Sequence, residues 1–312
     1  MKYKNNENEL IEKIGVVKID YHFYSGNDLY SDGEIENELL NIVKNNTDIT
    51  EVLGEDNRWS VLCHLSPQRR NLLEWYNFEP NSTILEIGAG CGALTGLLCD
   101  HAQKVVAIEL SKKRAEIIGH RYRDKANLEV IVGNLHDIQL NEKFDYITLI
   151  GVLEYAAKFT DSENPYRDFL IDIKKKLQPN GVLIIAIENK FGLKYWAGAK
   201  EDHTGKVFDS LEGYPQSRGI ATFGHDELTT LLNSANFSDI EYYYPMPDYK
   251  MPTNIFSKDY LPEIGQIGAC SPNYDQDRLV MFRENLVYNS LIKNDKFEFF
   301  ANSFLVFCKN RG

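Results

Sequence analysis

Three glycines and two acidic residues form the part of this sequence best suited to holding a nucleotide-type ligand. Gly88, Gly90 and Gly92 follow a short apolar run at every second position, and Glu86 stands two residues before the first of them. Glycine tolerates positive φ and lets a ligand approach the backbone closely. Glu109 ends the next apolar run, and an acid about 20 residues after such a turn can accept hydrogen bonds from both hydroxyls of a ribose.

The glycine spacing separates two kinds of ligand. The dinucleotide fingerprint G-x-G-x-x-G needs a glycine where this sequence has Ala93 or Thr95, so the spacing counts against NAD. Glu109 also has an alternative interpretation as an ordinary acid before a helix, where the helix dipole favours negative charge.

Acid–base chemistry has three candidate residues, Glu154, His203 and His225. Glu154 follows the apolar run 144–150, His203 follows the acidic pair Glu201 and Asp202, and His225 opens a predicted helix. Each could remove a proton from a hydroxyl nucleophile, and Glu154 could instead order an amino group of the bound ligand. The histidines and acids show no close ligand spacing along the chain, so no metal site is expected.

The elements that must position these residues are apolar runs separated by helical segments, which predicts an α/β fold. The runs occupy 84–87, 105–108, 128–132, 144–150 and 182–187, with later runs at 240–244 and 299–308. Ligands of open α/β sheets bind beyond the carboxyl ends of the strands. The glycine turn, Glu109 and Glu154 all follow such runs, so the site is expected at that edge.

Additions surround this core. Residues 1–66 are expected to form an N-terminal segment or lid, and residues 67–312 a domain with insertions at about 188–222 and 245–292. Ser66 is expected to cap a helix that Pro67 begins. The first insertion is rich in aromatic residues, which argues against disorder. In the second, 245–252 is expected not to be a central strand because of its prolines, and 278–292 is expected to be helical.

Composition bounds the class of protein. The 312 residues are 43% hydrophobic and 26% charged, with a net charge of −12, so the chain is typical of a globular protein and is not expected to bind nucleic acid. No run of about 18 apolar residues predicts a membrane span, and the polar start shows no signal peptide. Five cysteines without a C-x-x-C pair indicate reduced thiols and a cytoplasmic location.

The acid and glycine turn resemble motif I of the class I S-adenosylmethionine (SAM) methyltransferases. The resemblance implies SAM as cofactor and a Rossmann-like, seven-stranded sheet with an antiparallel last strand. The loop at 133–137 has Asn134 where these enzymes usually have an Asp against the adenine, and an amide can still pair with the adenine edge. The cofactor-binding residues implied in this way are Glu86, Gly88, Ala89, Gly90, Gly92, Glu109, Leu110, Asn134, Leu135, Ile150 and Gly151.

A wider resemblance covers segments 149–155, 188–195 and 201–205. They are similar to bacterial class I methyltransferases found alone or fused to glycosyltransferases in surface-polysaccharide contexts. This implies methylation of oxygen in a small or carbohydrate-like acceptor, with possible association with glycosyltransferases. Tyrosine and tryptophan can stack on sugar rings while offering a polar tip, so the candidate acceptor-binding residues are Tyr155, Asn189, Tyr195, Trp196, Tyr214 and Tyr249.

Other functions stay open on these observations. One is N- or O-methylation of a peptide or natural-product scaffold. Another is a non-catalytic SAM-fold module in a biosynthetic complex, against which the intact glycine turn and Glu109 argue. A third is an NAD-dependent dehydrogenase or epimerase, against which the glycine spacing argues.

Overall fold

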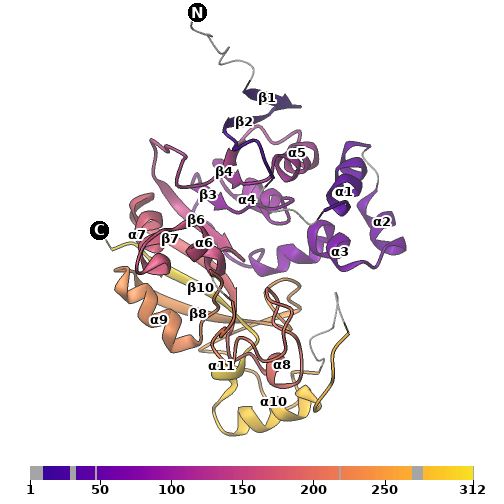
Figure 1. The fold of residues 1–312 in the computed structure, drawn as a ribbon, viewed down its shortest axis with the longest axis vertical. Helices are drawn as coiled ribbons and strands as arrows, with labels where there is room; N and C mark the ends of the chain where they lie inside the picture. Colours follow the sequence, from indigo (N-terminus) through magenta and orange to yellow (C-terminus); the bar gives the residue numbers. More distant parts are fainter. Residues whose placement is uncertain (1–9, 29–32, 46–47, 218, 269–276, 312) are drawn as a thin grey trace, which may run out of the picture. The chain divides into compact units, whose positions relative to one another are not determined.

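The computed structural model describes residues 10–28, 33–45, 48–217, 219–268 and 277–311. The chain divides into two compact units, an N-terminal unit Met1–Thr148 and a C-terminal unit Leu149–Gly312. Figure 1 shows the elements of both, and each unit is described by itself. No helix in the described parts of the chain is both long enough and apolar enough to cross a membrane.

Parallel strands form the centre of the N-terminal unit. The neighbouring strands run in the order β1-β2-β5-β4-β3, and all pairs except the β1–β2 hairpin are parallel. The strands β3, β4 and β5 match the predicted runs, and they are almost wholly buried because parallel strands are covered on both faces. The bounds are β1 (Ile11–Ile14), β2 (Val17–Phe23), β3 (Thr83–Ile87), β4 (Lys104–Glu109) and β5 (Leu128–Gly133).

Helices pack against these strands and against each other. Helix α1 packs on α5, where the buried Arg114 Nε donates to Glu36 Oε1 at 2.7 Å. Ser66 caps the following element as predicted, accepting from Gln68 N, but that element is a short 3-10 helix that ends at Leu72. The helices are α1 (Ile35–Lys44), α2 (Ile49–Glu55), α3 (Trp59–Leu65), η2 (Pro67–Leu72), α4 (Thr95–His101) and α5 (Lys112–Arg121).

Antiparallel strands form the sheet of the C-terminal unit, in the order β7-β10-β8-β9. Strand β6 (Phe144–Ile150) crosses the boundary between the units. The predicted α/β Rossmann-like fold, with parallel core strands and an antiparallel C-terminal strand, is confirmed; β1, β2 and β9 are additional strands. The remaining bounds are β7 (Leu177–Glu188), β8 (Ser238–Met246), β9 (Asn254–Ser257), β10 (Ser303–Lys309), η3 (Leu153–Tyr155), α6 (Ala156–Phe159), α7 (Pro165–Lys175), α8 (Leu193–Trp196), α9 (His225–Ser234), α10 (Glu284–Lys293) and α11 (Phe297–Phe300).

Two strand boundaries differ from the predicted ones. Strand β7 begins at Leu177, ahead of the predicted apolar run 182–187; Asn180 takes a positive φ of 64° there, yet its N–H still donates to Asn310 O. Strand β8 continues through Pro245 to Met246, although 245–252 was expected not to be part of a central strand because of its prolines. Pro245 lies next to the strand end, and its carbonyl accepts from Ser303 Oγ without any need for an N–H.

Two further boundaries differ near the C-terminus. The last strand begins at Ser303, not Phe299, because the preceding aromatic run forms the short helix α11. Helix α10 begins at Glu284 rather than Arg278. Arg278 instead makes an ion pair with Glu284, and both side chains are buried. The periodicity of a short continuous apolar run cannot distinguish a strand from a helix, which explains the first error.

Candidate functional site

The glycine turn after β3 has the backbone conformation that its composition predicts. Gly88, Gly90 and Gly92 have φ of 71°, 57° and 78°, a left-handed region that residues with a Cβ adopt only with strain. The N–H groups of Gly88 and Ala89 donate to Ile108 O at 2.9 and 3.1 Å. The turn is therefore fastened to the end of β4 and is followed closely by helix α4.

Glu109 fastens the same turn through its carboxylate. Its side chain is 4% exposed, and it accepts from Gly90 N at 2.7 Å and from Ser111 N at 2.9 Å. Burial raises the pKa of this carboxyl, against the lowering effects of Arg114 and the backbone donors. A carboxylate offers about four lone-pair sites, so these bonds are compatible with the predicted ribose contact.

Glu86 lies beneath the turn. It is buried and accepts from Thr95 Oγ1 at 2.6 Å, which ties β3 to the first residue of α4. Burial raises the pKa of Glu86 to about 8. This geometry suits a residue that positions the glycine turn for the cofactor.

The loop after β5 lies at the same edge of the N-terminal unit's sheet, because β4 and β5 are parallel with Glu109 opposite Val132. Asn134 Oδ1 accepts from His136 N at 3.1 Å, and Leu135 is buried. The structure thus brings together, at one sheet edge, the predicted cofactor-binding residues from Glu86 to Leu135. Ile150 and Gly151 belong to the C-terminal unit, where Gly151 has a φ of 68° and donates to Ala186 O.

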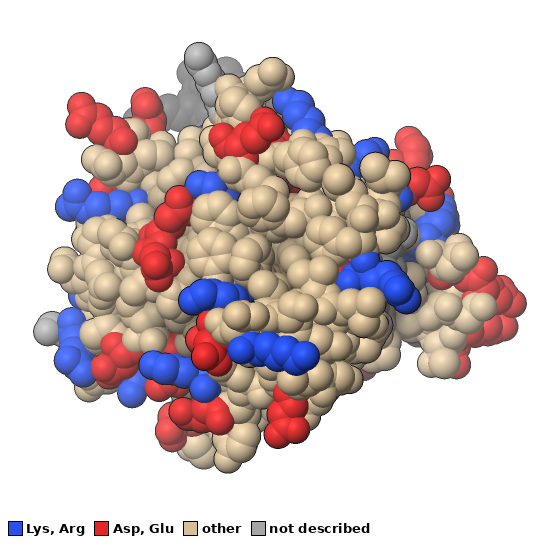
Figure 2. All heavy atoms as spheres, turned by 90° about the horizontal axis from the view of Figure 1, so that it is seen from below, with Lys and Arg blue, Asp and Glu red and all other residues tan. Residues whose placement is uncertain are grey.

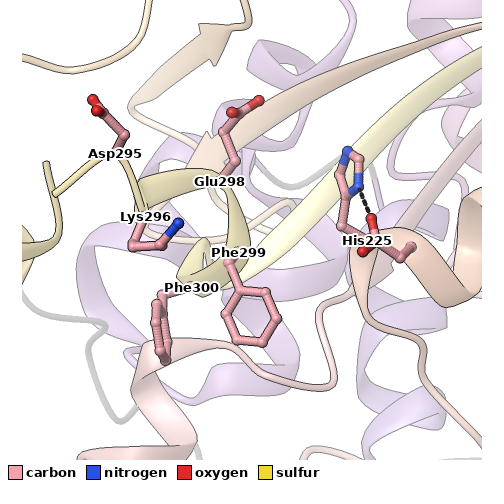
Figure 3. Close-up of a pocket in the computed structure, with 7 residues that line it drawn as sticks. His225, Asp295, Lys296, Glu298, Phe299 and Phe300 are labelled. Atoms are coloured by element: carbon pink, nitrogen blue, oxygen red, sulfur yellow. Dashed lines mark hydrogen bonds and ion pairs between the residues drawn. The ribbon is translucent and has the colours of Figure 1, made fainter.

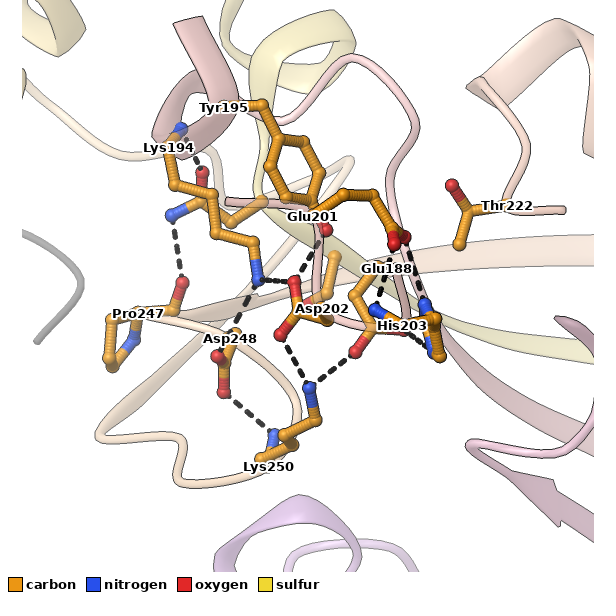
Figure 4. Close-up of polar contacts among 12 residues, drawn as sticks. Glu188, Lys194, Tyr195, Glu201, Asp202, His203, Thr222, Pro247, Asp248 and Lys250 are labelled. Carbon is orange, nitrogen blue, oxygen red and sulfur yellow. Dashed lines mark hydrogen bonds and ion pairs between the residues drawn. The ribbon is translucent and has the colours of Figure 1, made fainter. Parts of the chain in front are cut away.

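A buried histidine with three carboxylates is the centre of the second site, which lies wholly in the C-terminal unit. His203 Nδ1 is 2.9 Å from Glu201 Oε1, and its Nε2 is 3.4 Å from Glu154 Oε1 and 3.7 Å from Glu188 Oε2. The side chains of the three acids are 0–1% exposed and that of His203 is 6% exposed. We call these four residues, Glu154, Glu188, Glu201 and His203, the His203 cluster; Figure 4 labels Glu188, Glu201 and His203.

A chain of lysines and aspartates adjoins the His203 cluster. Lys250 Nζ lies 2.5 Å from Glu188 Oε1 and 2.7 Å from Asp202 Oδ1, while Lys194 Nζ lies 2.8 Å from Asp202 Oδ2. Lys194 is also 4.0 Å from Asp248 Oδ2. Burial opposes ionisation of Asp202, but the two lysines hold its pKa well below the usual range.

Protonation in the His203 cluster follows from the same contacts. Burial alone would lower the pKa of His203, yet the charge of Glu188 and the hydrogen bonds with Glu154 and Glu201 raise it well above its usual value. Burial raises the pKa of Glu154. Glu188 keeps a lowered pKa despite burial, because Lys250 and His203 stabilise its charge.

Four of the predicted acceptor-binding tyrosines surround these groups. The ring of Tyr155 lies edge-on to His203 with 5.3 Å between centroids. The Tyr195 hydroxyl donates to Asp202 Oδ2 at 2.6 Å, and the Tyr214 hydroxyl donates to Glu201 Oε1 at 3.1 Å. Tyr249 is buried, and its hydroxyl lies 2.9 Å from where a Cβ on Gly151 would be.

Three other predicted residues lie apart from the His203 cluster. His225 lines a groove of about 450 Å³ with Phe299 and Phe300, and its side chain contacts Asp226 (Figure 3). Trp196 is 44% exposed and contacts Phe300 edge-on.

Asn189 is buried and donates both amide hydrogens to backbone carbonyls, those of Phe299 and Ala301, while Phe191 N donates to its Oδ1. Its observed role is therefore to hold the end of β7 to the segment before β10, since the amide has no hydrogen left to donate to an acceptor.

Sequence reasoning missed three charged residues of this site, Glu188, Lys194 and Lys250. Glu188 could have been predicted from the sequence, because it is an acid that ends an apolar strand, at the sheet edge where ligands bind. No feature of the sequence pointed to Lys250, since it lies in the loop between β8 and β9. Of the acidic pair that precedes His203, Glu201 contacts the imidazole, whereas Asp202 contacts the two lysines.

Sequence comparison identifies the class of the central segment. Residues 85–185 match the family model described as "Methyltransferase domain". The chain is 28% identical over 119 residues to ribosomal RNA small subunit methyltransferase A of Alkaliphilus metalliredigens (34% of this chain, 42% of the relative). It is 30% identical over 111 residues to ubiquinone biosynthesis O-methyltransferase of Pelagibacter ubique (35% of this chain, 43% of the relative). The chain thus spans less than half the length of either relative.

Solved structures of similar arrangement are more distant in sequence. The putative methyltransferase in complex with the Trm112 activator of Haloferax volcanii has a TM-score of 0.48 at 15% identity, covering 79% of this chain and 89% of that one. A possible histamine N-methyltransferase from Thermotoga maritima has a TM-score of 0.46 at 17% identity, covering 80% and 92%. Residues 85–185 form a class I methyltransferase domain, whose cofactor is SAM.

Proposed function

We propose that this protein transfers the methyl group of SAM to an oxygen of a small, carbohydrate-like acceptor. The observation that carries the proposal is the His203 cluster, which offers buried carboxylates and an imidazole among hydroxyl-bearing tyrosines. In the transfer, an O–CH₃ bond forms, the S–CH₃ bond breaks and S-adenosylhomocysteine leaves. A sugar hydroxyl must also lose its proton, and Glu154 and His203 are the residues proposed to promote that loss.

The type of acceptor follows from side-chain chemistry and charge. Tyr155 is partly exposed beside His203, and a tyrosine ring suits stacking on a sugar while its hydroxyl can bond to it. Ribosomal RNA is named for several of the relatives, but the net charge of −12 disfavours a polyanion. On the face in Figure 2, basic side chains are interspersed with acidic ones instead of forming one basic patch. We therefore favour a neutral hydroxylated acceptor, of the kind that a cytoplasmic glycosyltransferase supplies.

Cofactor binding is the first test. Titration calorimetry should show binding of SAM and S-adenosylhomocysteine, with NAD much weaker. Glu109→Ala should weaken SAM binding by roughly 1.5–3 kcal/mol, because hydrogen bonds to a charged acceptor are lost. Glu142→Ala is the matched control, since Glu142 is an exposed partner of Lys104 and should leave the affinity unchanged. Preference for NAD, or an unaltered affinity of the Glu109 variant, would contradict the assignment.

The acceptor requires a separate assay. The protein is incubated with methyl-labelled SAM and panels of free sugars, glycans, peptides and ribosomal RNA. We expect label on a hydroxyl of a sugar-containing acceptor, stable to conditions that cleave esters. Label on RNA, on a peptide or on an amine would replace the proposed acceptor while leaving the methyltransferase assignment intact.

A further inference from the structure

Two buried carboxylate oxygens in the His203 cluster accept no hydrogen bond from any described residue. They are Oε2 of Glu154 and Oε2 of Glu188, on side chains that are 1% and 0% exposed. Buried polar atoms in folded proteins almost always have a partner, because burial without one is costly. Each of these oxygens therefore lacks the hydrogen-bond donor that burial ordinarily requires, although His203 Nε2 lies 3.7 Å from Glu188 Oε2.

The spacing of the cluster fits a single cation. Glu154, Glu188 and His203 each offer one ligand atom, and all three atoms lie within 4.8 Å of one another. His203 Nε2 is 3.4 Å from Glu154 Oε1 and 3.7 Å from Glu188 Oε2. Ligands at about 2.0–2.3 Å from one metal ion are roughly 3 Å apart when adjacent and a little over 4 Å when opposite.

Neighbouring groups already orient two of these ligands as in a metal site. Glu201 Oε1 lies 2.9 Å from His203 Nδ1, so Nδ1–H can donate to it, and Nε2 offers a lone pair to a metal ion once its own proton is lost. A carboxylate behind the ligating imidazole is the usual arrangement around protein-bound metals. Lys250 occupies Oε1 of Glu188, which directs Oε2 of that carboxylate towards His203.

The charges of the surroundings favour an added cation. Five acids gather here, namely Glu154, Glu188, Glu201, Asp202 and Asp248, and among the described residues the lysines that pair with them are Lys194 and Lys250. One positive charge on His203 leaves this group negative overall. A divalent ion bound to neutral His203 brings two positive charges, and it therefore neutralises more of the excess negative charge than the one proton of a charged His203 does.

We propose that Glu154, Glu188 and His203 bind one divalent metal ion of the Mn²⁺ or Zn²⁺ class. Mixed imidazole and carboxylate ligands suit these ions better than all-oxygen sites suited to Ca²⁺. On binding, the ion takes the lone pair of His203 Nε2, and any proton there leaves to solvent. Binding of the ion is independent of the proposed function. The role of the ion rests on that function: an open coordination position binds the acceptor hydroxyl and favours its ionised form.

The test titrates metal-free protein with Mn²⁺ and follows the electron paramagnetic resonance signal of the free ion. We expect one bound ion per chain, displaced by Zn²⁺. Glu154→Gln and His203→Ala should each weaken binding at least about tenfold, and Glu201→Gln about 10–100-fold, as for residues behind metal ligands. His225→Ala is the matched control, because His225 is an imidazole beside an acid outside the cluster, and it should bind like the wild type.

The possible outcomes distinguish failure of the proposed metal site from failure of the proposed methyltransferase function. Wild-type protein that binds S-adenosylhomocysteine but shows no saturable Mn²⁺ or Zn²⁺ binding overturns the metal site and leaves the methyltransferase proposal standing, even if the variants do not fold. Binding that survives equally in Glu154→Gln and His203→Ala also overturns the site. Binding lost in both variants and kept in His225→Ala supports it. Metal-loaded protein that binds neither SAM nor S-adenosylhomocysteine would instead defeat the proposed function.

Discussion

At the scale of single residues, burial decides how the acids around the glycine turn behave. Glu86 and Glu109 are both buried and both have raised pKa values, yet they have different partners. Glu109 accepts from the backbone of the turn, while Glu86 accepts from one hydroxyl, that of Thr95. The folded chain therefore holds an acid beneath the turn whose charge is poorly compensated.

The buried carboxyl of Glu86 should make the free energy of unfolding depend on pH. Its pKa is about 8 in the folded chain against 4.5 as the ordinary value, so the folded state holds the proton more tightly. The stabilisation from the protonated carboxyl is complete below the unfolded pKa and is lost as pH rises through the folded pKa. Glu86→Gln cannot ionise, so its free energy of unfolding relative to the wild type should rise between about pH 5 and about pH 8.5.

Urea unfolding of both proteins at the two pH values measures the difference. The exposed Glu142→Gln serves as control and should show no such trend. A difference between Glu86→Gln and wild type that does not change with pH would show that this carboxyl does not titrate as inferred.

At the scale of elements, glycines are needed where a turn must approach a helix. Gly92 has a φ of 78°, and a Cβ added there would lie 2.9 Å from Tyr122 Cε2 and 3.1 Å from Ile118 Cγ1. Both neighbours belong to α5 or its C-terminal end. The turn after β3 and helix α5 therefore constrain each other.

Gly92→Ala should lower the free energy of unfolding by about 1–3 kcal/mol, from left-handed strain and overpacking. Gly54→Ala provides the opposite case, because Gly54 is inside α2 and a Cβ there meets nothing within 4 Å. It should raise stability by about 0.5–1 kcal/mol, since alanine is the better helix former. Thermal unfolding of the two variants would refute this account if both shifted in the same direction.

At the scale of the whole molecule, the N-terminal segment and the 188–222 insertion are the parts of the chain whose role towards the cofactor is still a prediction. Residues 193–196 of the 188–222 insertion form α8, and Lys200 and Val207 form an isolated antiparallel bridge. The N-terminal segment contributes β1 and β2, and β2 extends the sheet of its unit beside β5. That these segments close over the cofactor stays a prediction from the sequence.

Hydrogen exchange with and without S-adenosylhomocysteine measures such closure. Both segments should gain protection with the ligand, because methyl transfer benefits from exclusion of water. The 128–133 strand β5 is the internal reference, since it is buried in either case. Equal exchange of both segments in the two states would mean that neither is a lid.

The sequence by itself determined the parts that depend on neighbours along the chain. Apolar runs predicted β3, β4, β5 and β6 nearly to the residue, and the glycine spacing predicted a turn with positive φ after β3, because strand burial and positive φ are local requirements; SAM itself was implied by the resemblance. The tertiary structure alone decided the His203 cluster. Glu154, Glu188, His203 and Lys250 come from four separate segments, and only folding determines which buried charges must neutralise one another.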